Sequence, residues 1–149
     1  MPFKISYKSI MKHFTRILIF LFVALLGVSS CGDEPDGKWA KMKWTNVNNL
    51  MNVGGVYILP DDGGSFSFLC RNYEHPWIES VTVNGVQHSA NEDRLAYNGE
   101  WFTVKFEGNN MIVTAQPLPA NLDSRGFNIQ VTAGDIFDSL VFSQQRNMY

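Results

Sequence analysis

The chain has 149 residues, of which 12 are Lys or Arg, 14 are Asp or Glu and 13% are aromatic. Four basic residues precede residue 31 and every acidic residue follows it, which leaves 8 basic against 14 acidic residues from there on, a net charge of −6. Nucleic acids and anionic lipid headgroups both attract basic surfaces, so this balance argues against either as a partner.

The first 30 residues have the layout of a secretory signal. They begin with four basic residues, Lys4, Lys8, Lys12 and Arg16. An unbroken apolar run follows from Ile17 to Leu26, and small residues come after it. Even counted to Val28, the run has about 12 residues, whereas a helix that crosses a bilayer needs roughly 20. We therefore expect a cleaved signal peptide over residues 1–30.

The residues before Cys31 resemble a bacterial lipobox. Val28-Ser29-Ser30 place an aliphatic residue and two small residues directly ahead of the cysteine. The resemblance implies that Cys31 carries lipid and becomes the first residue of the mature chain. An ordinary secretory signal with an incidental cysteine is the alternative. Two or three acyl chains hold a protein far more firmly than one, so the membrane is an expected partner.

A short acidic tether rich in Gly and Pro follows, from Gly32 to Lys38. It resembles the sequence that directs lipoproteins of the Bacteroidota to the outer face of the outer membrane. A solvated spacer is the alternative, and it leaves the periplasmic face open. The expected organisation is a signal peptide over 1–30, lipidated cysteine and tether over 31–43, and one folded domain over 44–149.

The rest of the chain alternates apolar and polar residues with period two, which is typical of half-buried strands. The pattern is clearest in three segments, 65–70, 101–106 and 127–132. In the second, Phe102, Val104 and Phe106 share one face, and Trp101 falls on the other. Cys70 lies in phase with the apolar face of its segment, which favours a buried thiol over a disulfide to another chain.

Turn residues separate these segments. Asn84-Gly85 between two short β-prone runs is a strong hairpin signal. Further turns are expected at 107–110 and 133–135, and no segment of helical period is found after Cys31. Seven to nine short antiparallel strands with frequent turns indicate an all-β fold, a sandwich of two sheets.

Several segments resemble BACON domains, the Bacteroidetes-associated carbohydrate-binding modules. They are Gly63-Gly64 before an alternating strand, Asn72 with Pro76-Trp77-Ile78, Asn121 to Arg125 before a strand, and Ser143-Gln144 at the end of the last strand. The resemblance spans roughly residues 53–145. It implies an immunoglobulin-like β-sandwich with Trp77 on a strand, and a carbohydrate-binding role. Because such a core usually needs a large aromatic, we expect Trp77 to fill that place.

Catalytic and metal-binding patterns are scarce. Glu92 and Asp93 are adjacent carboxylates, but neighbours on an extended chain point to opposite sides, so a solvated loop is the expected setting. His75 and His88 lack metal-ligand spacing. We expect no enzyme, no metal and no cofactor.

Aromatic residues are the candidate ligand contacts, because exposed Trp and Tyr rings offer flat amphipathic faces to sugars. The candidates are Trp101, Tyr97, Tyr73 and Trp44. For Trp101 two roles stay open, a ligand platform and a structural cover.

Two functions remain in competition. The first is a non-catalytic, lipid-anchored surface module that binds polysaccharide through exposed aromatics. The second is a structural component of an outer-membrane surface complex with a protein partner and no glycan affinity, which predicts an apolar patch or an open sheet edge.

Overall fold

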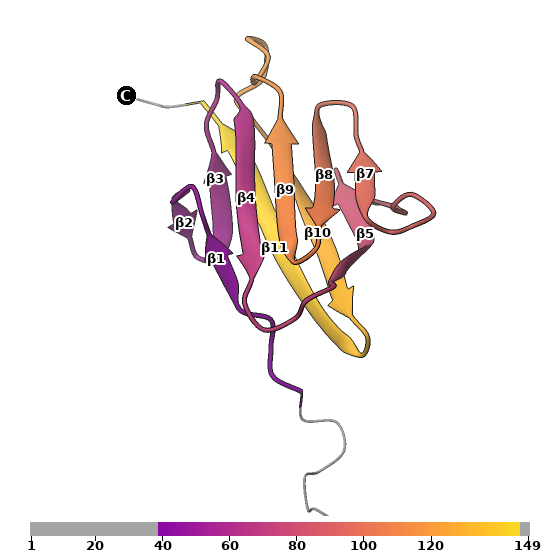
Figure 1. The fold of residues 1–149 in the computed structure, drawn as a ribbon. Coiled ribbons are helices and arrows are strands. Elements are labelled where there is room, and N and C mark those ends of the chain that lie inside the picture. Colours follow the sequence, from indigo (N-terminus) through magenta and orange to yellow (C-terminus); the bar gives the residue numbers. More distant parts are fainter. Residues whose placement is uncertain (1–38, 147–149) are drawn as a thin grey trace, which may run out of the picture. The chain divides into compact units, whose positions relative to one another are not determined.

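The computed structural model describes residues 39–146, and these form a β-sandwich (Figure 1). The predicted signal peptide, the predicted lipid site Cys31 and the predicted tether up to residue 38 lie outside the described residues. Among residues 39–146 there is no helix with the length and apolar character that crossing a membrane requires.

Between residues 39 and 146, eleven strands make up the two sheets. In chain order they are β1 (Trp44–Asn46), β2 (Asn52–Val53), β3 (Val56–Leu59), β4 (Gly64–Cys70), β5 (Trp77–Val83), β6 (Val86–His88), β7 (Ala96–Asn98), β8 (Phe102–Glu107), β9 (Asn110–Ala115), β10 (Ser124–Ala133) and β11 (Ile136–Gln145). One sheet has the order β1-β4-β9-β8-β7, and the other has the order β2-β3-β11-β10-β5-β6.

This strand order is that of an immunoglobulin-like sandwich. Strands β1, β4, β9 and β8 take the places of A, B, E and D, and β5, β10 and β11 take those of C, F and G. The predicted fold class is confirmed. Two details differ: four strands of only two or three residues raise the count above the expected nine, and β3 pairs with β11 in parallel.

The predicted alternation positions the core. In β8 the buried side chains are Phe102, Val104 and Phe106, while the residues between them are exposed. Cys70 is fully buried at the end of β4, as its phase predicted. The predicted turns join β8 to β9 and β10 to β11.

A row of aromatic rings fills the space between the sheets. Phe102 and Phe127 stack with centroids 3.7 Å apart, and Phe127 stacks on Phe142 at 4.9 Å. Phe142 meets Phe68 edge to face at 5.2 Å. All four rings are buried, so their contacts with one another make this row part of the core.

Trp77 does not fill the core, contrary to the sequence-based prediction. The next residue, Ile78, is fully buried, and successive side chains in a strand point to opposite faces. Trp77 is therefore half-buried, and its indole Nε1 is buried without a hydrogen-bond partner. Phenylalanines occupy the central positions in its place.

The segment before β1 is attached to the sandwich. The Asn72 side chain accepts a hydrogen bond from the Lys43 amide at 2.8 Å and donates one to the Lys41 carbonyl at 3.0 Å. Met42 is buried. Residues from Trp39 onward belong to the compact unit that contains this core.

Candidate functional site

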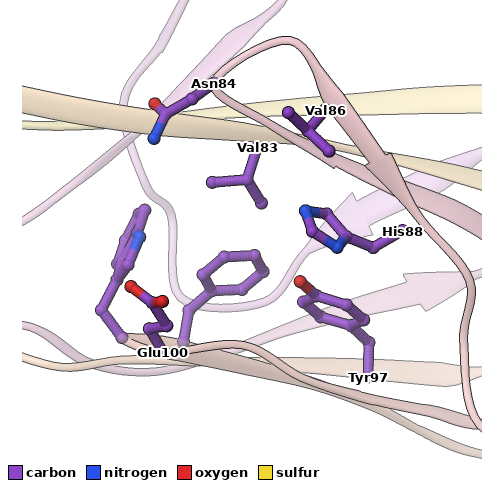
Figure 2. Close-up of a pocket in the computed structure, with 8 residues that line it drawn as sticks. Val83, Asn84, Val86, His88, Tyr97 and Glu100 are labelled. Carbon is purple, nitrogen blue, oxygen red and sulfur yellow. The ribbon is translucent and has the colours of Figure 1, made fainter.

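A pocket of about 250 Å³ lies between the β5–β6 hairpin of one sheet and strands β7 and β8 of the other. Figure 2 shows Asn84 and Val86 on one side of the pocket and Tyr97 and Glu100 on the opposite side. The residues that line it are Val83, Asn84, Val86, His88, Tyr97, Glu100, Trp101 and Phe102. Both sheets thus contribute to one site.

The hairpin wall comes from the predicted Asn-Gly turn. Asn84 and Gly85 have φ angles of 51° and 77°, the left-handed region that two-residue hairpin turns require. Val83 pairs with Val86 across this turn. The turn leaves the Asn84 side chain exposed at the pocket, where its amide can donate and accept hydrogen bonds.

Trp101 precedes β8 in a bend and is partly buried, whereas the sequence pattern placed it inside the strand, on the face opposite Phe102 and toward solvent or a neighbouring loop. Its ring meets Phe102 and Phe127 edge to face, with centroids 4.8 and 5.3 Å away. The guanidinium carbon of Arg125 lies 3.9 Å from the ring centroid. One indole face is therefore covered, so Trp101 is structural cover as well as pocket wall.

Arg125 is held by hydrogen bonds of its own. Its Nε donates to Oε1 of Gln144 at 2.7 Å, and its Nη2 donates to the carbonyls of Gln116 and Pro117 at 2.7 and 2.8 Å. Gln144 is fully buried and donates through Nε2 to the carbonyls of Pro60 and Gln116. Burial lowers the pKa of Arg125, but a guanidinium stays charged in proteins.

These contacts give a structural role to two residues that carried the BACON resemblance. Arg125 and Gln144 join the β10–β11 pair to the loop after β9 and hold Trp101 against the core. Arg125 and Gln144 therefore stabilise one end of the sandwich, next to the pocket.

Tyr97 forms the other aromatic wall. Its ring packs on Phe102 with centroids 5.5 Å apart and lies 6.0 Å from the imidazole of His88. Burial raises the pKa of Tyr97, and the negative charge of Glu100 raises it further. The phenol is therefore neutral at physiological pH and able both to donate and to accept a hydrogen bond.

Of the four candidate aromatics, the structure brings together Trp101 and Tyr97. Tyr73 lies in a second pocket, of about 260 Å³, with Trp39 and the turn between β10 and β11. Its hydroxyl donates to the carbonyl of Ala40, so it holds the segment before β1.

Trp44 lies apart from both pockets. Its Nε1 donates to the Asp138 carboxylate at 2.9 Å, and this bond joins β1 of one sheet to β11 of the other. Because its indole N–H is already hydrogen-bonded to Asp138, Trp44 links the two sheets.

Asn84, His88 and Glu100 were not among the sequence candidates. The Asn-Gly signal placed Asn84 in a turn, but nothing in the local pattern brings that turn opposite β7. Within the described part of the chain, no three His, Cys, Asp or Glu side chains gather as a metal site. Asp93 accepts a hydrogen bond from the Leu95 amide in an exposed loop, as expected of a turn residue.

Comparison with known proteins gives a match over most of the chain. An NMR structure of a protein from Bacteroides thetaiotaomicron is 32% identical, covers 80% of this chain and 98% of its own, and superposes with a TM-score of 0.65. No protein-family model matches the chain. No curated protein sequence matches it either.

Two titin domains are more distant. The M1 domain is 12% identical over 73% of this chain and 97% of its own, with a TM-score of 0.46. Domain M7 is 10% identical over 72% and 96%, with a TM-score of 0.38. At these TM-scores the titin domains add nothing to the fold derived from the strand order.

Proposed function

The chain belongs to the same family of β-sandwich proteins as the Bacteroides thetaiotaomicron protein, and on that premise we propose that it is a non-catalytic binding module that recognises glycan at the pocket of Tyr97 and Trp101. The observation that carries the proposal is the composition of the pocket. Aromatic rings lie beside polar groups that can donate and accept hydrogen bonds, and sugars require both kinds of contact.

The proposal includes a localisation at the cell surface. Lipid on Cys31 would anchor the module in the outer membrane, facing either the exterior or the periplasm, and the acidic tether favours the exterior. The BACON-like segments support a carbohydrate ligand in the same bacterial group. Residues 39–146 contain the described core, so a chain that begins at Gly32 is expected to fold without lipid.

Affinity electrophoresis of this chain against a polysaccharide panel tests the proposal. Trp101 is a poor first variant because its loss also removes the support of Arg125. Val86→Lys is better, since Val86 is 57% exposed at the pocket and its replacement leaves the core untouched. The matched control is Val53→Lys, because Val53 is 58% exposed on β2, an edge strand at the other end of the same sheet.

We expect at least one glycan to retard the wild type and the Val53 variant, and to leave the Val86 variant unretarded. Circular dichroism should show that all three are folded. Equal retardation of the two variants would mean that glycan binds elsewhere, and no retardation by any glycan would remove the proposed function.

One observation favours the second candidate, a protein-interaction role. Three exposed apolar side chains, Val47, Met51 and Val53, come from a stretch of seven residues that includes the edge strand β2. An open sheet edge flanked by apolar residues is a typical protein-binding surface. This role predicts a cross-linked adduct in native membranes that Val53→Lys abolishes and Val86→Lys retains.

A further inference from the structure

The charges around the pocket limit the sugars that it can accept. Glu100 is the sole acidic residue among the eight that line it, and none of the eight is Lys or Arg. The remaining polar side-chain groups belong to Asn84, His88, Tyr97 and the indole N–H of Trp101. Sites for carboxylates and sulfates normally present Arg or Lys, which form strong charge-assisted hydrogen bonds with those groups. Such a partner is absent from the lining.

The nearby guanidinium of Arg125 does not change this balance. It is not a lining residue, and it lies against the Trp101 ring. Its Nε and Nη2 already donate to Gln144 and to two backbone carbonyls, Gln116 and Pro117. Recruiting Arg125 to an anionic ligand would leave the buried Gln144 oxygen without its donor, which is costly.

The apolar surfaces favour an uncharged ring. Val83, Trp101 and the buried Phe102 line the pocket together, and a carboxylate placed there would lose water without gaining a cation. The volume of about 250 Å³ is below the roughly 300–1,000 Å³ of pockets for drug-sized ligands. This volume fits one sugar unit better than several.

From these three features we infer that the pocket selects one uncharged sugar unit and discriminates, through Glu100, against sugars that carry a carboxylate or a sulfate. The inference rests on the proposed glycan-binding function and names the class of its ligand. Glu100 acts as a specificity-determining residue that repels anions, while the aromatic rings and Asn84 supply the contacts common to all sugars.

The test is a titration of the ¹⁵N-labelled chain from Gly32 with pairs of methyl glycosides, followed by NMR. Each pair has a neutral hexoside and the matching hexuronide, for example methyl glucoside and methyl glucuronide. The reporters are the amides of residues 84–86 and 97–102 and the indole N–H of Trp101. We expect one neutral glycoside to shift these signals and its uronide to bind about tenfold more weakly, since a like charge within a few ångströms at a partly exposed site costs that much.

Glu100→Gln should reduce the neutral-to-acidic ratio to about threefold or less, with little change in affinity for the neutral sugar. The control is Glu74→Gln, which removes an exposed carboxylate outside the pocket and should leave the ratio unchanged. A uronide that binds the wild type as tightly as its neutral partner, or a ratio that Glu100→Gln does not alter, would overturn the inference while glycan binding stands. No shift with any glycoside would overturn the inference that the pocket selects one sugar unit, and retardation on the polysaccharide panel would then decide whether glycan binding itself stands.

Discussion

Arg125 and Trp101 form a stacked pair, with the guanidinium carbon 3.9 Å from the centroid of the indole ring. Arginine suits this position because its planar group can stack on a ring and donate hydrogen bonds at its edge at the same time. Here the edge donates to the buried Gln144 and to the carbonyls of Gln116 and Pro117. The pair therefore links the core, the loop after β9 and one wall of the pocket.

Replacing Arg125 with Lys should lower the free energy of unfolding by about 2–3 kcal/mol, because a lysine cannot keep the stacking and all three hydrogen bonds, and Gln144 Oε1 would lose its donor. Urea denaturation followed by Trp fluorescence measures the change. As a control, Arg71→Lys removes an exposed hydrogen bond to Thr45 and should cost less than about 1 kcal/mol. An equal decrease in the free energy of unfolding for Arg125→Lys and Arg71→Lys would contradict the structural role of the Arg125–Trp101 pair.

Gly63 gives a second prediction, which concerns the Gly-Gly segment before β4. Its φ is 76°, and a Cβ there would clash with the carbonyl oxygen of Ala115 and the backbone of Gln116. Gly63→Ala should therefore cost about 2 kcal/mol or more, from backbone strain and displaced main chain. Gly54 has a φ of 58° with open space around it, so Gly54→Ala should cost only about 1–2 kcal/mol, from strain alone. Thermal unfolding of the two variants separates the cost of backbone strain from the cost of displacing the main chain. The Gly63→Ala variant must be the less stable of the two.

The two tyrosines with raised pKa values predict a loss of stability at high pH. Burial is the main cause for both Tyr57 and Tyr97, with added repulsion from Asp138 and Glu100 respectively. The folded state keeps the phenolic protons at a pH where unfolded tyrosines, with pKa values of about 10, have lost theirs. The free energy of unfolding should therefore be constant below pH 10 from this source and fall as the pH rises above it.

Denaturant titrations between pH 8 and 11 test this dependence. The double variant Tyr57→Phe/Tyr97→Phe should show a shallower decline than the wild type, because its rings have no proton to lose. An unchanged decline in the double variant would assign the effect to other groups. Tyr73→Phe, at a tyrosine in the second pocket, is a suitable control for the loss of a hydroxyl.

Cys70 predicts slow thiol chemistry in the folded protein. Its side chain is fully buried at the end of β4 and forms no disulfide among the described residues. An aromatic disulfide reagent should label this cysteine only after local or global opening, at a rate that denaturant accelerates. Rapid labelling under native conditions would contradict the packing around this strand.

Local sequence patterns predicted the strands well, because the alternation that marks a strand involves only residues close together in the chain. The alternation from Phe102 to Phe106 assigned the inner face of β8 correctly, and Asn84-Gly85 identified the β5–β6 hairpin. The resemblance placed Trp77 on a strand correctly, but its expected place in the core was wrong, because Ile78 in the same strand takes the inward-facing position. A single aromatic at a strand end is a weaker guide than the alternation around it.

The site itself could be predicted only in part. Trp101 and Tyr97 were candidates by residue type, but their pairing with Asn84 depends on two sheets meeting at one edge, which no local pattern encodes. The same is true of Trp44, whose hydrogen-bond partner Asp138 lies 94 residues further along the chain. Tertiary contacts over such distances decide which exposed aromatics remain available to a ligand.

The parallel pairing of β3 with β11 has a consequence for the order of folding. Val56 to Leu59 align with Val141 to Gln144. Strand β3, which comes early in the chain, therefore cannot complete its pairing until the last strand, β11, is in place. Until β11 is present, β3 lacks its parallel partner, and the hydrogen bonds of the buried Gln144 to Pro60, Gln116 and Arg125 cannot form. Non-local contacts of this kind slow folding to the range of milliseconds to seconds typical of all-β domains. We therefore expect the sandwich to close cooperatively, and a chain truncated before Ile136 to remain unfolded.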